Sequence, residues 1–181
     1  MAKREALRDL QTRLAKRLQA AQSEGLSVDW LAVKAGGHHY LLPLAQSGEI
    51  VALGPVQPVP HTRPWFKGVL NVRGRLLGLV DLADFVAAFG GPAVLASATT
   101  TALVPASVLS LNASLEINCA LQIDLLAGLR GKDAFASSSP ADSAAPAWFG
   151  SCHVDAGGQS WQEINLQALA QSAAFLGIAD P

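Results

Sequence analysis

Short apolar runs, each ended by glycine or proline, constrain the fold of this chain more than any other feature. The clearest example is PWFKGVLNVRGRLLGLVD over residues 64–81, in which the apolar segments 68–72 and 75–81 flank Arg73 and Gly74. Two apolar runs joined by a short turn that contains glycine predict a β-hairpin. A strand that only fills a core has no need of Arg73, so this arginine needs a separate explanation.

The rest of the chain follows the same pattern of short strands and few helices. Helical spacing with a glycine stop predicts a helix over 82–90, and a second helix is expected after residue 164 with Asn165 as its N-cap. The small, polar, proline-bearing stretch 131–147 predicts a mobile loop. The expected strands outside the hairpin are 30–35, 38–44, 49–53, 102–111, 115–126, 148–154 and 160–164. Many short strands with helices mainly at the ends favour a mainly β fold of small barrels.

The first 25 residues form a separate unit in this interpretation. Leucines at spacings of three and four make one apolar stripe, and residues 1–24 carry six basic against three acidic residues. We expect an amphipathic helix over 1–25 that packs its leucines on a domain spanning 26–181. Binding to a partner or to an anionic membrane surface is the alternative task for this helix.

The composition excludes several classes of protein. Hydrophobic residues make up 50% and charged residues 15% of the 181 positions, which is typical of a globular chain with a large core. A formal net charge of −1 gives no electrostatic reason to bind nucleic acid. The uncharged stretch 85–115 is broken by glycine, proline and polar residues, so it does not predict a membrane span. Without a signal peptide or paired cysteines, we expect a soluble cytoplasmic protein.

Motifs of catalysis and metal binding are missing from the sequence. It has no phosphate-binding loop, nucleophile elbow, zinc-binding helix or Cys-x-x-Cys pair. His38 and His39 are neighbours on one strand and should point to opposite faces, and the same holds for Cys152 and His153. Cys119 reads as a small hydrophobic residue of the core. We therefore expect no enzyme activity, no metal and no cofactor.

The hairpin segment resembles the signature of the CheW-like domain family. The residues that carry the resemblance are Gly68, Val69, Asn71, Val72, Arg73, Gly74, Val80, Asp81 and Leu82. Within the family the chain is most similar to PilI-type adaptors of type IV pilus (twitching motility) chemosensory systems, through its leucine-striped first helix, residues 30–50 and the late segment WQEINL.

The resemblance implies both a fold and a role. The fold would be two intertwined SH3-like five-stranded β-barrels with N- and C-terminal helices. The role would be that of a non-catalytic adaptor, which couples the cytoplasmic tip of a methyl-accepting chemoreceptor to the regulatory domain of a CheA-type histidine kinase. Such an adaptor is cytoplasmic, is recruited to receptor arrays at the inner membrane, and needs no cofactor, nucleic acid or membrane insertion.

Seven residues are the candidates for a receptor or kinase interface. We expect Gly74 to allow a sharp turn that places Arg73 at a strand end for a bidentate ion pair with a carboxylate, and Asn71 to satisfy backbone groups of the same turn. The resemblance implies Glu49 as the partner of Arg73, because Glu49 stands where the family has a glutamate on the neighbouring strand. The remaining candidates, Leu44, Val51 and Val72, would line an apolar groove, although core packing explains them about equally well. An ordinary exposed hairpin arginine remains the alternative for Arg73, and a structural plug is the interpretation of Trp65 and Phe66.

A different function remains open on the residues alone. A small-molecule-binding or enzymatic β-barrel unrelated to chemosensing would need a polar pocket with convergent titratable groups. The four histidines of the chain show no such grouping in the sequence.

Overall fold

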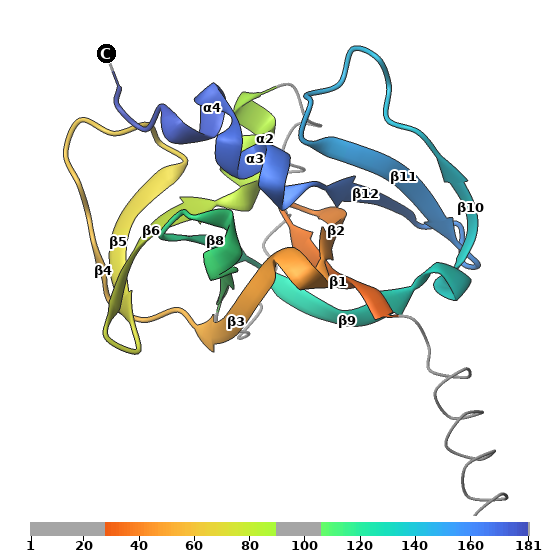
Figure 1. The fold of residues 1–181 in the computed structure, drawn as a ribbon, viewed down its shortest axis with the longest axis horizontal. Coiled ribbons are helices and arrows are strands. Elements are labelled where there is room, and N and C mark those ends of the chain that lie inside the picture. The colour runs from red at the N-terminus through yellow and green to blue at the C-terminus, as the bar shows by residue number, and fades with distance from the viewer. Residues whose placement is uncertain (1–27, 90–105, 181) are drawn as a thin grey trace, which may run out of the picture.

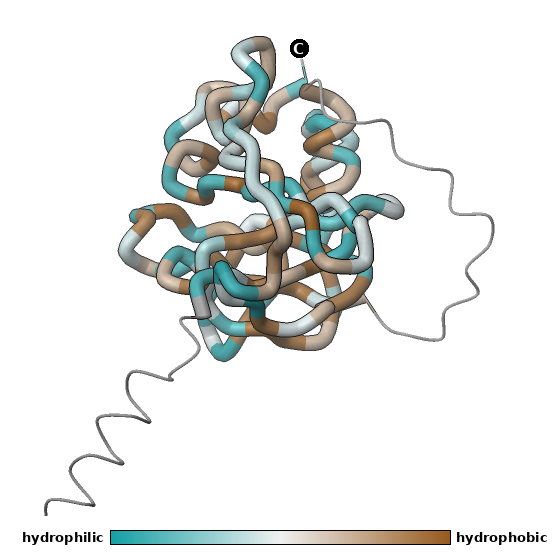
Figure 2. Tube along the Cα trace, turned by 90° about the vertical axis from the view of Figure 1, so that its right-hand side faces the viewer, coloured by the Kyte–Doolittle hydropathy of each residue, from teal (hydrophilic) through white to brown (hydrophobic). Residues whose placement is uncertain are grey.

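The computed structural model describes residues 28–89 and 106–180, and these residues form two β-sheets with short helices at their junction (Figure 1). The helix expected over 1–25 lies outside the described residues. Figure 2 shows that apolar stretches of the described chain are short and interrupted by polar ones. No helix among the described residues is long and apolar enough to cross a membrane.

Sheet A joins the beginning and the end of the described chain. Its strand order is β10-β11-β12-β2-β1-β9, with β2 and β12 parallel and the other pairs antiparallel. The strands are β1 (Val28–Ala35), β2 (His38–Pro43), β9 (Leu125–Gly131), β10 (Phe135–Ser139), β11 (Phe149–Asp155) and β12 (Ser160–Ile164).

Sheet B is formed by the chain between β2 and β9. Its order is β3-β7-β8-β6-β5-β4, with β6 and β8 parallel. The strands are β3 (Ser47–Ala52), β4 (Val56–Gln57), β5 (Phe66–Val72), β6 (Arg75–Asp81), β7 (Ser107–Leu111) and β8 (Cys119–Ile123). In both sheets the two edge strands follow one another in the chain. The mainly β fold of two intertwined sheets is confirmed, with six strands in each sheet where five were expected.

The described residues also form six short helices, and three of them cover the junction between the sheets (Figure 1). Asp81 and Asn165 cap α2 and α3 by accepting backbone N–H bonds from Asp84 and Ala168, and the cap at Asn165 was expected from the sequence. The α-helices are α2 (Leu82–Ala88), α3 (Leu166–Gln171) and α4 (Ala173–Leu176), and the 3₁₀ helices are η1 (Leu44–Gln46), η2 (Ala113–Leu115) and η3 (Lys132–Ala134).

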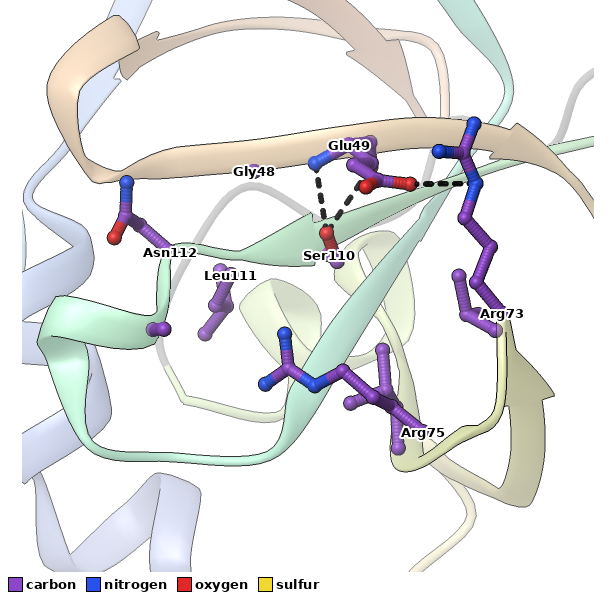
Figure 3. A pocket seen from close by; sticks show the side chains of 10 residues that line it. Gly48, Glu49, Arg73, Arg75, Ser110, Leu111 and Asn112 are labelled. Atoms are coloured by element: carbon purple, nitrogen blue, oxygen red, sulfur yellow. Dashed lines mark hydrogen bonds and ion pairs between the residues drawn. The ribbon is translucent and has the colours of Figure 1, made fainter.

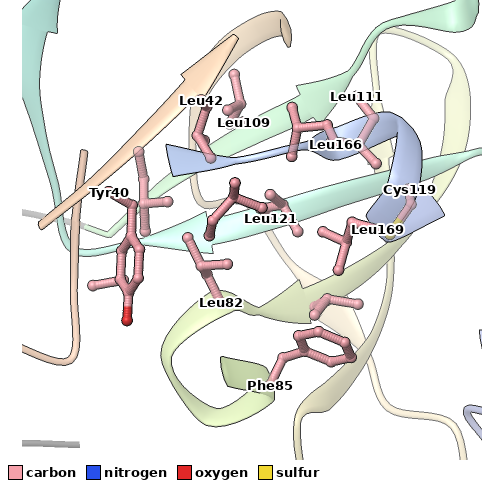
Figure 4. Close-up of a cluster of buried hydrophobic side chains, with 14 of the residues drawn as sticks. Tyr40, Leu42, Leu82, Phe85, Leu109, Leu111, Cys119, Leu121, Leu166 and Leu169 are labelled. Carbon is pink, nitrogen blue, oxygen red and sulfur yellow. The ribbon is translucent and has the colours of Figure 1, made fainter. Parts of the chain in front are cut away.

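The largest hydrophobic cluster lies between the two sheets and the helices, and we call it the shared core. In Figure 4, Leu42 of sheet A, Leu109 and Leu121 of sheet B, and Leu166 and Leu169 of α3 meet in this cluster. Each leucine is fully buried, which is worth roughly 1.5–3 kcal/mol per side chain. Two smaller clusters fill the interiors of sheet B and sheet A separately. The sheets are therefore held together by packing that neither could form alone.

Trp65 and Cys119 both belong to the shared core. Trp65 is buried with its ring 5.0 Å from that of Phe85, which confirms it as a structural plug. Cys119 is buried as well, and burial raises the pKa of its thiol to about 12. This confirms that Cys119 packs as an apolar residue.

Gln46 lies on η1, where the chain passes from sheet A to sheet B, and it forms hydrogen bonds with two other elements of the fold. Its side-chain oxygen accepts hydrogen bonds from the backbone N–H groups of Leu166 and Gln167 at the start of α3, at 2.9 and 3.3 Å. Its carbonyl oxygen accepts from the N–H of Asn112, just after β7. One residue thus links β2, β7 and α3.

Two predicted segments were wrong in detail. Residues 115–126 do not form one strand, because the chain passes from sheet B to sheet A at Asp124. The N–H of Asp124 donates to the carbonyl of Lys34 at 2.9 Å, and its carboxylate accepts from the N–H of Gly36 at 2.8 Å. Residues 131–147 are not an irregular loop throughout, since they contain η3 and β10. Phe135 of β10 packs against Trp30 and His153. These contacts could not be predicted from a segment in which small polar residues dominate.

A glycine-to-alanine pair tests the backbone of the β5–β6 turn. Gly74 has a φ of +85° and Gly54 has no positive φ, while a Cβ atom at either position would meet nothing within 4 Å. Gly74→Ala should lower the free energy of unfolding by about 1 kcal/mol through left-handed strain, and Gly54→Ala should leave it within about 0.5 kcal/mol or raise it slightly. Urea unfolding of both variants measures this. Equal effects would show that the turn places no special demand on residue 74.

Candidate functional site

The turn between β5 and β6 places Arg73 at the tip of a hairpin. Arg73 and Gly74 have φ values of +50° and +85°, the pattern of a type I′ turn. The side-chain oxygen of Asn71 accepts a hydrogen bond from the N–H of Gly74 at 2.8 Å. The expected turn geometry and the expected task of Asn71 in it are confirmed.

Arg73 and Glu49 form an ion pair, as expected, but through a single contact and not in the bidentate geometry that was predicted. Nε of Arg73 lies 3.1 Å from Oε2 of Glu49 on β3, as Figure 3 shows. The two side chains are 76% and 53% exposed, so the pair lies at the surface and is not enclosed. An exposed pair stabilises a fold by about 0–1 kcal/mol. The pair uses the Nε edge of the guanidinium, which has further N–H donors for another acceptor.

The position of Glu49 depends on Gly48 and Ser110, two residues that the sequence analysis missed. Ser110 Oγ accepts from the N–H of Glu49 at 2.8 Å and donates to its carbonyl oxygen at 3.2 Å. A Cβ atom at Gly48 would lie 2.5 Å from that hydroxyl, so only glycine lets β3 and β7 approach this closely. The irregular register between Ser47 and Ile50 reflects the same contact. In the sequence, only Gly48 itself could have indicated that β3 and β7 approach closely here.

A surface hollow of about 160 Å³ lies beside the ion pair, and we call it the hairpin hollow. Arg75 borders it, and its guanidinium also reaches the side-chain oxygen of Asn118 at 3.3 Å. The lining residues are Gly48, Glu49, Val72, Arg73, Arg75, Leu77, Ser110, Leu111, Asn112 and Ala113. The structure thus brings Glu49, Val72 and Arg73 together.

Leu44 and Val51 do not line the hairpin hollow. Leu44 lies on η1 with its side chain exposed, and Val51 packs against the core of sheet B. Leu76, next to the hairpin tip, is 63% exposed, and Ile50 beside Glu49 is exposed as well. Sheet B thus exposes two large apolar side chains on the two strands that carry or adjoin the ion-paired residues, and we treat this surface as a candidate protein-binding face.

A second set of exposed apolar side chains lies on sheet A. Leu125, Leu126 and Leu129 are exposed on β9, which is an edge strand. Edge strands with apolar side chains tend to pair with another chain unless they are protected. The two apolar surfaces are on different sheets, and the chain therefore has two separate candidate binding faces.

The structure separates Cys152 from His153, the thiol and imidazole that are neighbours in the sequence. Cys152 and His153 border two different surface hollows, so the sequence-adjacent pair is separated. The ring of His39 packs against Trp161, with its pKa lowered chiefly by burial. No group of three or more histidine, cysteine, aspartate or glutamate side chains suited to a metal ion occurs among residues 28–89 and 106–180.

Comparison with known proteins identifies the family. The model of the CheW-like domain matches residues 29–174, so this chain belongs to the CheW-like domain family. Protein PilI of Pseudomonas aeruginosa is 30% identical over 171 residues, which cover 92% of this chain and 89% of the relative. The scaffolding protein TtCheW from Thermoanaerobacter tengcongensis has a similar fold, with a TM-score of 0.56 and 14% identity over 76% of this chain and 88% of the other.

A double-mutant cycle on Arg73 and Glu49 measures how much the pair stabilises the fold. We expect Arg73→Gln, Glu49→Gln and the double variant each to change the free energy of unfolding by less than about 1 kcal/mol, since both side chains are exposed. Chemical denaturation provides the values. A coupling energy of about 3 kcal/mol or more would mean that the pair is buried in solution and would contradict its exposed position.

Proposed function

We propose that this chain is a non-catalytic adaptor that couples a methyl-accepting chemoreceptor to a CheA-type histidine kinase. The observation that carries the proposal is the pair of separate apolar binding faces, one around the Arg73 hairpin on sheet B and one along β9 on sheet A. An adaptor must hold two partners at once, and two faces on different sheets allow this. Membership of the CheW-like domain family supports the same role.

The surface around the Arg73 hairpin is assigned to the receptor. Arg73 is exposed, is paired with Glu49 through one edge, and retains donors for a carboxylate of a partner. Leu76 and Ile50 supply exposed apolar area beside it. The seven candidate interface residues have different positions. Asn71 and Gly74 shape the turn. Glu49, Val72 and Arg73 border the hairpin hollow. Leu44 and Val51 lie outside the hairpin hollow and would contribute to the receptor surface next to it.

The leucines of β9 are assigned to the regulatory domain of the kinase. The resemblance to CheW-like proteins implies that this domain has the same fold and pairs barrel to barrel with the adaptor. An edge strand with Leu125, Leu126 and Leu129 exposed suits such a contact between two sheets. The similarity to PilI supports control of type IV pilus twitching motility as the output, with the adaptor recruited from the cytoplasm to receptor arrays.

Charge reversal at Arg73 tests the receptor surface. Wild-type protein should co-purify with both a receptor tip and a kinase regulatory domain, and Arg73→Glu should lose the receptor while it keeps the kinase. The charge-swapped variant with Glu49→Arg and Arg73→Glu should not regain the receptor, because the exposed donors of Arg73 are proposed to contact it directly. If folded wild-type protein binds neither partner, the adaptor function is wrong and a small-molecule-binding barrel becomes the leading alternative.

Two leucines with nearly equal exposure test the kinase surface. Leu129 on β9 is 54% exposed and Leu176 on α4 is 56% exposed. Leu129→Ser should weaken binding of the kinase regulatory domain by about tenfold or more, as expected for an apolar contact at the centre of an interface. Leu176→Ser is the matched control and should leave binding unchanged in calorimetric titration. Equal losses in both variants, or none in either, would remove β9 from the interface.

A further inference from the structure

A pocket at one end of the sheet A interior combines aromatic rings with a carboxylate. Its volume is about 400 Å³, within the range of small-molecule sites. Trp30 comes from β1, Phe135 from β10, His153 from β11 and Glu163 from β12, with Lys132 of η3 at the rim. None of these residues lines the hairpin hollow or belongs to the apolar faces of the adaptor, so the pocket, which we call the sheet A pocket, needs its own explanation.

Three rings form the wall of the sheet A pocket. The centroid of the His153 ring lies 4.9 Å from that of Trp30 and 5.0 Å from that of Phe135, and the Trp30 and Phe135 rings meet edge to face at 5.9 Å. The faces of tryptophan and phenylalanine rings attract cations, and the attraction grows where water is partly excluded. An aromatic wall of this kind favours a positively charged ligand.

The carboxylate of Glu163 lies among these rings with only one of its oxygens hydrogen-bonded to the wall. Oε1 accepts a hydrogen bond from the indole Nε1 of Trp30 at 3.0 Å. Oε2 lies 3.8 Å from Nε2 of His153, too far for a hydrogen bond. In the described part of the chain, no lysine or arginine nitrogen lies within 4.0 Å of this carboxylate. The side chain of Glu163 is 23% exposed, so its carboxylate can be reached from the pocket by a cationic ligand.

His153 contributes a buried polar atom without a hydrogen-bond partner at the same place. Its side chain is only 9% exposed, and Nε2 is buried without a hydrogen-bond partner in the described structure. A buried polar atom left unpaired costs about 1–3 kcal/mol, so such atoms usually have a function or a bound partner. A ligand with two N–H groups could donate to His153 Nε2 and Glu163 Oε2 together, because these atoms are neighbours across the pocket.

We propose that the sheet A pocket binds a guanidinium group. A guanidinium is planar, stacks on aromatic rings, is weakly hydrated and offers several N–H donors in a fixed fork, whereas an ammonium ion is compact and strongly hydrated. Glu163 supplies the negative charge, and the rings of Trp30 and Phe135 supply the stacking surface. The group can belong to a small guanidino compound or to an arginine side chain of a protein partner.

NMR titration of the full chain with agmatine tests the proposal. The protein has four tryptophans, and the indole N–H signal of Trp30, assigned with Trp30→Phe, should shift while that of Trp65 in the shared core should not. Butylurea, which has neither charge of agmatine, and butylamine, which carries an ammonium alone, should cause no comparable shift. If Trp30 responds to agmatine no more than to these two controls, the guanidinium site does not exist.

Two charge variants move the affinity in opposite directions. Glu163→Gln keeps an oxygen for Trp30 but removes the charge, and should weaken agmatine binding about tenfold or more. Lys132→Ala removes a repelling charge from the rim and should tighten binding about twofold. Partial unfolding would weaken binding, so a tighter affinity cannot result from it. Asp133→Asn, at an exposed carboxylate next to Lys132, is the control and should stay near wild type. Equal affinities in the Glu163→Gln and wild-type proteins would overturn the proposal, and if Glu163→Gln fails to fold, the Lys132→Ala result decides.

A blocked tripeptide with a central arginine separates the two sources of the guanidinium. Tighter binding of the tripeptide than of agmatine supports an arginine of a partner protein, and weaker binding supports a small guanidino compound. If neither shifts the Trp30 signal, the pocket does not bind guanidinium groups from either source. The titration needs no receptor or kinase, so its result is independent of the adaptor function.

Discussion

Burial of apolar side chains between the two sheets is the interaction on which the rest of the structure depends. The interiors of sheet A and sheet B hold small clusters, while the shared core draws residues from both sheets and from all three α-helices. Separating the sheets would expose the fully buried leucines in Figure 4. The relative placement of the Arg73 hairpin and the β9 edge is therefore set by core packing and not by contacts between those surfaces themselves.

Polar interactions refine this arrangement at the places where the chain changes sheet. Gln46 at the first crossing binds the start of α3 and the end of β7, and Asp124 at the second crossing binds the backbone of Lys34 and Gly36 in sheet A. Backbone groups at a crossing lose their strand partners, and buried ones need replacements. One residue at each crossing thus supplies these hydrogen bonds, through its side chain and its backbone together.

Local chemistry made the hairpin predictable from the sequence, and the ion pair was predictable through family resemblance. Arg73-Gly74 between two apolar runs has few alternatives to a tight turn, and Asn71 caps it by a bond that spans three residues. The partner Glu49 is on another strand, and only the resemblance to a known family pointed to it. Ser110 was not predictable, because its contact with Glu49 depends on the pairing of β3 with β7 and on the irregular register at Gly48.

The sheet A pocket and strand β10 were missed for a related reason. The sequence predicted a loop over Lys132 to Ser139 because small polar residues dominate this segment. Its one aromatic residue, Phe135, packs against Trp30 and His153, which lie on other strands. These partners are about 20 to 100 positions away in the chain and belong to other strands. Conversely, the late strands expected at 148–154 and 160–164 and the cap at Asn165 were confirmed, since each is determined by residues close in sequence.

The order of the strands also determines when the molecule can take shape during synthesis. Sheet A pairs β2 with β12, and some 120 residues must be made between these two strands before they can meet. Sheet B closes on itself with β8 and has all of its strands available while β9 to β12 are still inside the ribosome. Because the shared core requires both sheets, the early sheet emerges with one apolar face uncovered. During synthesis the apolar face of sheet B therefore stays uncovered until β12 can pair with β2, a long-range step that forms slowly. This uncovered face is the surface that chaperones or other chains can bind until then.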